Sequence, residues 1–148
     1  MGVVVDSSIF IAAERGRFDW AGFHGQIGAE RLFLTAVTLA ELLHGAERAD
    51  TPERRAARRK FVADVEARYP LLAFGRAEAE EYAKLSAELA SRGEPIGTHD
   101  QMIAAIARRH GHRVATLNAA DFRRVPNLAI ADAEPFRLTA KQGKKPTD

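Results

Sequence analysis

The sequence predicts one α/β domain with three layers, α/β/α, in which helices cover both faces of a mostly parallel sheet of five strands. Short apolar runs alternate with longer helical patterns along the chain, and this order is typical of right-handed βαβ crossovers. The first run, Val3–Val5, is apolar at every position, as a strand buried on both faces requires. The length of 148 residues suits a single domain whose core needs no disulfide or structural metal.

The amino-terminal half is divided by residues that start and stop helices. Gly16 ends the helix that follows the first strand. Thr35 suits the cap of a helix that runs to about residue 48. Thr51 fits the cap of the next helix and Pro52 its first position. That helix should end before Pro70, because the residue before a proline is disfavoured in the helical conformation. These signals predict strands at residues 3–5 and 31–34 and helices at residues 8–15, 18–27, 36–48 and 52–69.

The carboxyl-terminal half shows the same alternation of strands and helices. Residues 76–91 place acids and bases over an apolar stripe, and Gly93 lies beyond their end as a stop signal. Residues 98–101 fit a capping box, and behind it apolar residues recur with helical spacing as far as Gly111. The remaining strands are predicted at residues 71–74, 113–116 and 128–130.

Composition excludes several classes of protein. Cysteine is absent, so disulfide frameworks and thiolate metal sites are excluded. No apolar run approaches the roughly 20 residues of a membrane span, and no signal peptide is visible, so we expect a cytoplasmic protein with no membrane partner. Residues 136–148 are polar and should form a disordered tail outside the domain of residues 1–135.

The net charge is only +2, but one predicted helix carries a basic stripe. This stripe is either a solvated face or a contact for RNA phosphates or a protein partner. Its members are Arg54, Arg55, Arg58, Arg59 and Lys60.

Four acids follow the predicted strands or lie in the helices next to them. Asp6 comes directly after the first strand, and Glu41 lies in the helix after the second. Asp100 opens the helix before the fourth strand, and Asp121 follows that strand. Because the carboxyl ends of parallel strands meet at one edge of a sheet, we expect these carboxylates to gather there. They would repel one another without a cation, and oxygen ligands without cysteine select Mg²⁺ or Mn²⁺.

Each acid also has a purely structural explanation. Asp6 and Asp100 could cap helices, and an exposed acid is the ordinary case for Asp121. Gly45, one turn beyond Glu41, indicates a close backbone approach near that acid. Separate caps need not fall in this order along the chain, so the order and placement together favour a shared metal site.

Four segments carry a resemblance to a known family. They are VVVDSSIFI at residues 3–11, TAVTLAEL at residues 35–42, PIGTHDQMIAA at residues 95–105 and TLNAADF at residues 116–122. In this order they resemble the PIN-domain ribonucleases, and the match is best to the VapC-type toxins of bacterial toxin–antitoxin systems. The resemblance runs from about residue 3 to about residue 130 and implies a PIN-like fold.

The resemblance implies a Mg²⁺-dependent endoribonuclease toxin in which a metal-activated water cleaves structured RNA, either tRNA or rRNA, and so arrests translation. It also implies a VapB-type antitoxin as partner, and a homodimer. Asp6 and Asp100 would then bind the metal directly, and Glu41 directly or through water. Asp121 would help to hold a second ion.

The same resemblance suggests supporting residues. Ser7 would hold the loop of Asp6 or a water on the metal. Asn118 lies where some members carry an acid, so either Asn118 or Asp121 completes the fourth corner of the site. His99 is either a surface histidine or a group that helps to protonate the leaving group.

Two other classes of function compete with this interpretation. A phosphotransfer enzyme of the haloacid-dehalogenase type would need an acid two residues after Asp6, where Ser8 stands. A receiver domain would need a lysine after the last strand, and residues 131–133 supply none. A non-catalytic PIN-type module that binds RNA or protein is the closer alternative. The presence of all four acids argues against it.

Overall fold

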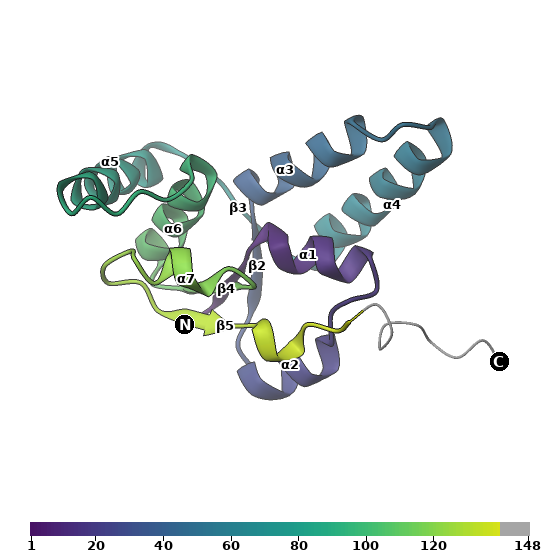
Figure 1. Ribbon diagram of the computed structural model, residues 1–148, viewed down its shortest axis with the longest axis horizontal. Helices are drawn as coiled ribbons and strands as arrows, with labels where there is room; N and C mark the ends of the chain where they lie inside the picture. The colour runs from purple at the N-terminus through teal and green to yellow at the C-terminus, as the bar shows by residue number, and fades with distance from the viewer. Residues whose placement is uncertain (140–148) are drawn as a thin grey trace.

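Five parallel strands form one sheet in the order β3-β2-β1-β4-β5, with helices on both sides of it (Figure 1). The structure is a computed structural model, and it describes residues 1–139. The strands are β1 (Val3–Val5), β2 (Leu32–Thr35), β3 (Leu71–Leu72), β4 (Arg113–Thr116) and β5 (Ile130–Asp132). The helices are α1 (Ser7–Glu14), α2 (Trp20–Ile27), α3 (Ala36–Glu47), α4 (Pro52–Arg68), α5 (Arg76–Ser91), α6 (Thr98–His110) and α7 (Ala119–Phe122), and a 3₁₀ turn, η1 (Glu134–Phe136), follows β5.

Most helices begin and end at the capping residues that the sequence predicts. The Thr35 hydroxyl accepts a hydrogen bond from an amide of the first turn of α3, and Thr51 does the same for α4, each at 3.1 Å. Tyr69 is extended before Pro70 and ends α4. Gly111 ends α6 in the left-handed conformation, with a φ of 69°, which glycine adopts without strain.

The core lies on both faces of the sheet, because alternate residues of β1 point to opposite layers. Val3 and Val5 pack with side chains of α1, α2 and α4, whereas Val4 packs with α5 and α6. All three are fully buried, and each burial stabilises the fold by roughly 1.5–3 kcal/mol relative to an exposed side chain. The predicted three-layer α/β/α architecture is therefore confirmed, with a sheet that is parallel throughout the described residues.

Two predicted strands differ from the observed ones because of register. The strand predicted at residues 71–74 ends at Leu72, since its partner β2 ends at Thr35, where α3 begins. The last strand lies two residues later than predicted. Its first residue, Ile130, pairs with Val114, so in this register the predicted start at residue 128 would lie beyond the first residue of β4, Arg113.

The capping box predicted at residues 98–101 is wrong. Gly97 is the N-cap of α6, and Thr98 is already helical. The Gln101 side chain turns back and donates to the Ile96 carbonyl at 2.9 Å. An amide can donate as well as accept, so the glutamine satisfies a carbonyl of the preceding loop rather than an orphan amide of the helix.

The start of the predicted tail is folded onto the domain. The Leu138 amide donates to the Arg17 carbonyl at 2.9 Å, and the Phe136 carbonyl accepts from the Asp19 amide at 2.8 Å. The rest of that tail, residues 140–148, lies outside the described residues, and a domain boundary at residue 135 stays a prediction. Within the described part of the chain, no helix combines the length and the apolar character needed to cross a membrane.

Candidate active site

The carboxyl ends of β1 and β4 lie side by side at the point where the strand order reverses. The chain passes from β1 outward to β2 and β3, and then returns to the other side of β1 to form β4 and β5. In open α/β sheets such a switch point leaves a crevice beyond the strand ends, where ligands bind. Asp6 follows β1 and Thr116 ends β4, so both side chains stand at this point.

The Asp6 carboxylate is buried and held by four hydrogen bonds; the residue is only 3% exposed. Its Oδ1 accepts from the Ser7 hydroxyl and the Ser8 amide, each at 3.1 Å. Its Oδ2 accepts from the Ser8 hydroxyl at 2.9 Å and from the Thr116 hydroxyl at 2.5 Å. The bond from the Ser8 amide caps α1, so the structural role considered for Asp6 is present. The three hydroxyl bonds are additional and fix the orientation of the carboxylate.

Glu41 extends from α3 toward Asp6 and has one oxygen without a partner. Its Oε2 accepts from the Ser7 hydroxyl at 3.4 Å and lies 3.9 Å from His99 Nδ1. Its Oε1 is buried and accepts no hydrogen bond from the described residues. Burial raises the pKa of Glu41 and Asp6 adds to this effect, while His99 and Ser7 oppose it. A buried, unpaired carboxylate oxygen is costly unless a cation or a proton meets it.

Asp100 stands in the first turn of α6, half-buried, with no hydrogen bond or ion pair to any residue of 1–139. It does not cap the helix. Burial, followed by the charges of Asp6, Glu41 and Asp121, raises the pKa of Asp100 from 3.8 to about 6, although His99 opposes the shift. Because these interactions require proximity, the raised pKa indicates that the four acids are neighbours.

Asp121 and Asn118 form a hydrogen-bonded pair at the start of α7. Asn118 Nδ2 donates to Asp121 Oδ2 at 2.8 Å, and an Arg124 guanidinium nitrogen lies 3.7 Å from the other carboxylate oxygen. The two candidates for the fourth corner thus lie together. Asp121 alone of the two carries a negative charge that acts on Asp100.

Sequence reasoning missed Thr116 and the part played by Ser8. Thr116 is fully buried, and its hydroxyl accepts from the Asn118 amide at 2.8 Å while donating to Asp6. The Ser8 hydroxyl accepts from the Leu117 amide at 3.1 Å and so ties α1 to the end of β4. A signal for Thr116 was present, since a hydroxyl at the last position of a buried strand must find partners.

The donor set suits a hard divalent cation. It consists of carboxylate oxygens with a serine hydroxyl between two of them, and both Glu41 Oε1 and the Asp100 carboxylate lack partners in the described residues. Within residues 1–139, no group of three or more Asp, Glu or His side chains already encloses a site for an ion. The acids are therefore neighbours at the crevice rather than a closed set of ligands.

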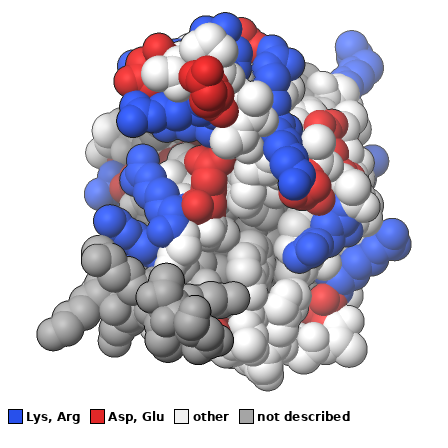
Figure 2. All heavy atoms as spheres, turned by 90° about the vertical axis from the view of Figure 1, so that its right-hand side faces the viewer, with Lys and Arg blue, Asp and Glu red and all other residues white. Residues whose placement is uncertain are grey.

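Basic side chains gather around scattered acids on the face that includes the exposed ends of α1 and α4 (Figure 2). Within the predicted basic stripe of α4, most of the guanidinium groups already have partners. Arg54 pairs with Asp50 at 2.8 Å, Arg59 pairs with Glu47, and Arg58 donates to a carbonyl of α3 at 2.8 Å. These contacts tie α4 to the end of α3, so much of the stripe has a structural role.

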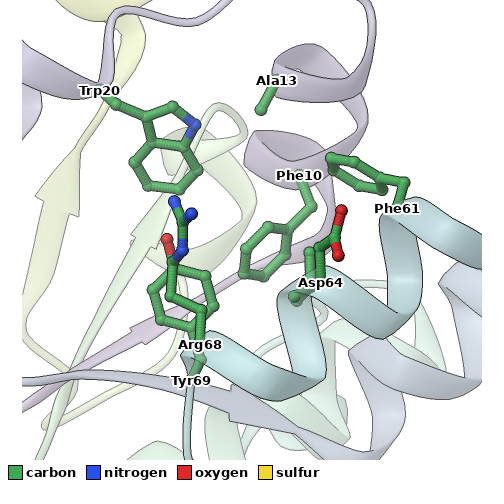
Figure 3. A pocket seen from close by; sticks show the side chains of 8 residues that line it. Phe10, Ala13, Trp20, Phe61, Asp64, Arg68 and Tyr69 are labelled. Atoms are coloured by element: carbon green, nitrogen blue, oxygen red, sulfur yellow. The ribbon is translucent and has the colours of Figure 1, made fainter.

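A hollow of about 190 Å³ between α1, α2 and α4 contains none of the four acids (Figure 3). Phe10, Trp20 and Tyr69 form its aromatic wall, and the Trp20 and Tyr69 rings stack with their centroids 6.3 Å apart. Burial raises the pKa of the Tyr69 hydroxyl, against the effect of Arg68. The chemistry of the acids is therefore separate from this aromatic hollow.

A family model described as the PIN domain matches residues 3–128. Those residues include all four acids as well as Ser7, Thr116 and Asn118.

Curated relatives match over much of the chain. Ribonuclease VapC1 of Rickettsia felis is 35% identical over 133 residues, which cover 88% of this chain and 95% of the relative. The tRNA(fMet)-specific endonuclease VapC of Salmonella typhimurium is 36% identical over 106 residues, which cover 72% of this chain and 78% of the relative.

Solved structures match the fold. The DNA-bound VapBC from Salmonella typhimurium aligns with a TM-score of 0.78 at 30% identity, covering 89% of this chain and 98% of the other. VapBC-5 from Mycobacterium tuberculosis aligns with a TM-score of 0.69, also at 30% identity, covering 88% of this chain and 97% of the other.

Proposed function

The chain belongs to the PIN-domain family, and we propose that it is a divalent-metal-dependent endoribonuclease of the VapC type, the toxin of a toxin–antitoxin pair. One observation supports the metal-dependent chemistry most strongly. Asp100 is half-buried, has no partner in residues 1–139, and lies among three further acids at the switch point of the sheet. A cation would offset the repulsion among these carboxylates, and a nuclease of this family would use that cation in cleavage.

We propose that Asp6 and Asp100 bind Mg²⁺, with Mn²⁺ as a substitute, and that Glu41 and Asp121 complete the site. The unpaired Glu41 Oε1 and the free Asp100 carboxylate support this assignment. The ion would stabilise negative charge on the phosphate oxygens and make water a better nucleophile near neutral pH.

The protein's own groups would position these ligands. Thr116 and Ser8 hold Oδ2 of Asp6, so that the carboxylate keeps one orientation when substrate arrives. Ser7 lies between Asp6 and Glu41, and its hydroxyl is within hydrogen-bond distance of a carboxylate oxygen of each. Asn118 would orient Asp121 through its amide rather than bind the ion itself. Preorganisation of this kind lowers the cost of reaching the reactive geometry.

The relatives support a proposal for the substrate and the partner. One relative is named for cleavage of tRNA(fMet), and the aligned structures are VapBC complexes. We propose that this chain cleaves structured RNA, tRNA or rRNA, that a VapB-type antitoxin inhibits it, and that it forms a homodimer. An antitoxin arginine would neutralise the acids by a charge-assisted contact.

Chelation followed by metal addition tests this function. Purified protein should cleave RNA in Mg²⁺, lose the activity in excess chelator and regain it when Mg²⁺ or Mn²⁺ is restored, leaving 5′-phosphate ends. Binding of RNA without cleavage under every metal condition would instead identify a non-catalytic RNA-binding module.

A further inference from the structure

A basic hollow of about 450 Å³ runs along the exposed face of α1 and is distinct from the aromatic hollow. One wall is α1 itself, from Ser8 past Ile11 to Arg15, and Arg17 follows in the next turn. The opposite wall is the segment around Arg137, whose main chain is held against Phe18 and Arg17. The hollow therefore has a framework of one helix and one extended segment.

The charge in this hollow is of one sign. Arg15, Arg17 and Arg137 all line it, and none of its described lining residues is an acid. The Arg137 guanidinium already donates two hydrogen bonds to the Glu134 carboxylate, at 2.9 and 3.0 Å. Arg15 and Arg17 are exposed and have no ion-pair partner within residues 1–139. Among the described residues, no acid pairs with these two guanidinium groups, and each can bind an anion.

The hollow borders the proposed active site through Ser8. This residue lines the hollow, and its hydroxyl donates to Asp6 at 2.9 Å. Arg15, the C-cap of α1, lies seven positions after Ser8, a distance of about 10 Å along the helix. An RNA strand bound in the crevice at Asp6 would therefore reach Arg15 within a few nucleotides.

Charge also favours this direction over the opposite flank of α1. There, a hollow of about 160 Å³ reaches Arg15 from the other side, but its charge is mixed, because Glu14 and Glu41 line it beside Arg15 and Arg58. Guanidinium groups bind phosphates through paired hydrogen bonds, and a wall without acids leaves that attraction unopposed.

We propose that Arg15 and Arg17 bind the backbone phosphates of the RNA next to the cleaved bond, so that the strand leaves the acids along α1 toward Arg137. This inference rests on the proposed ribonuclease function and adds the path of its substrate. The two arginines contact RNA outside the reacting atoms and act as binding residues, not catalytic ones.

The test compares the double variant Arg15→Gln/Arg17→Gln with the control Arg92→Gln/Arg109→Gln. The control removes the same charge from exposed arginines that have no ion pair in the described residues and that lie on α6 and at the end of α5. Neither pair uses its side chains in the fold, so melting temperatures should match the wild type. The probe for binding is a labelled single-stranded RNA of mixed sequence, measured with the full chain in chelator over a range of salt concentrations.

The site variant should weaken RNA binding and reduce the slope of log affinity against log salt by about 1.4, which corresponds to two lost phosphate contacts on a single strand. With Mg²⁺ and bulk tRNA it should raise KM and leave kcat unchanged, because the lost contacts are equally present in ground and transition states. The control variant should behave like the wild type in both assays.

Four results would overturn the proposal. If both variants lose affinity equally, the attraction is diffuse and the hollow is not a site. If the site variant binds RNA normally but loses affinity for the antitoxin, the hollow is a protein-docking surface. If the wild type neither binds nor cleaves RNA, the proposed ribonuclease function itself is contradicted. If the wild type cleaves RNA and the site variant binds and cleaves it equally well, only the proposed path of the strand is contradicted.

Discussion

Asp6 shows how one carboxylate serves the fold and the proposed chemistry together. One of its oxygens caps α1 through the Ser8 amide, and the other is bound by the hydroxyls of Ser8 and Thr116. A helix cap and a metal ligand are therefore compatible roles for this residue. Asp100 differs, because its carboxylate has no hydrogen bond to the described residues and does not cap α6. Its placement among other acids is costly for the metal-free protein.

Asp100→Asn should stabilise the metal-free protein at neutral pH. The folded-state pKa of Asp100 is raised from 3.8 to about 6, so the favourable, protonated form is fully populated below pH 4 and is lost as the pH rises through 6. The melting temperature of the variant in chelator should therefore equal that of the wild type near pH 4 and exceed it at pH 7. Differential scanning fluorimetry between these values measures the difference.

The same comparison in Mg²⁺ supplies the control for Asp100. Metal should raise the melting temperature of the wild type and leave that of Asp100→Asn nearly unchanged, because ligands that bind only the folded state stabilise it. A variant that gains as much from Mg²⁺ as the wild type would remove Asp100 from the ligand set.

Thr116→Val should reduce both stability and cleavage. Valine keeps the β-branched shape but removes the donor to Asp6 and the acceptor for the Asn118 amide, at a cost of about 1–3 kcal/mol. Cleavage should then need more Mg²⁺, since Asp6 loses one of the groups that orient it. Thr116→Ser retains the hydroxyl and should restore the metal requirement, whereas a serine variant as impaired as valine would assign Thr116 to packing alone. Urea unfolding and Mg²⁺ titrations of activity measure the two effects.

At the scale of helices and strands, the boundaries that could be predicted are those with a local chemical signal. Helix ends are marked by Thr35 and Thr51, whose hydroxyls accept hydrogen bonds from backbone amides, and by Gly111, which adopts the left-handed conformation. Each of them stands where the sequence predicts a helix end. The start of α6 could not be read in this way, because Gly97 has no side chain and Gln101 bonds to the preceding loop. The short length of β3 depends on where β2 stops, which only the paired sheet reveals.

Thr51→Ala should destabilise the domain by about 1 kcal/mol without changing the metal requirement. The Thr51 hydroxyl accepts from the Arg54 amide at the start of α4, and alanine offers no acceptor. Chemical denaturation measures the loss, and Thr51→Ser should show little of it. The Thr51 hydroxyl contacts the start of α4 and none of the four acids, so a large change in cleavage per folded molecule would mean that α4 controls the site in a way not visible in this structure.

For the whole molecule, the alternation of strands and helices was sufficient to predict three layers, but not the order of the strands. The order places β1 beside β4, and this neighbourhood brings Asp6 to Thr116 across 110 positions of sequence. The acids could be proposed from the sequence because their order along the chain, with the family resemblance, suggested a shared site. Among the hydroxyls that hold Asp6, Ser7 was suggested by the same resemblance, whereas Ser8 and Thr116 were not, because serine and threonine are common and only the fold shows what they contact.

Binding of an antitoxin is also a property of the whole molecule. Co-expression with the small open reading frame next to this gene should rescue growth that the chain alone arrests, and the purified complex should not cleave RNA in Mg²⁺. The physical reason is that an arginine contact at the acids competes with the cation. If no co-encoded protein binds the chain in a pull-down from cells that express both, the toxin role is contradicted, but the proposed ribonuclease activity is not.

The central claim is that the acids hold a metal that RNA cleavage requires, and the variant Asp6→Asn/Asp100→Asn tests it most directly. Asparagine keeps the shape of each side chain and caps a helix about as well as aspartate, so the fold should survive. Loss of two negative charges relieves carboxylate repulsion, and this offsets the hydrogen bonds that the Asp6 carboxylate accepts and the amide NH2 group cannot, so the melting temperature in chelator should stay close to that of the wild type. RNA cleavage at a Mg²⁺ concentration that saturates the wild type is the measurement. The account predicts no cleavage by the folded variant, and cleavage at the wild-type rate would contradict it.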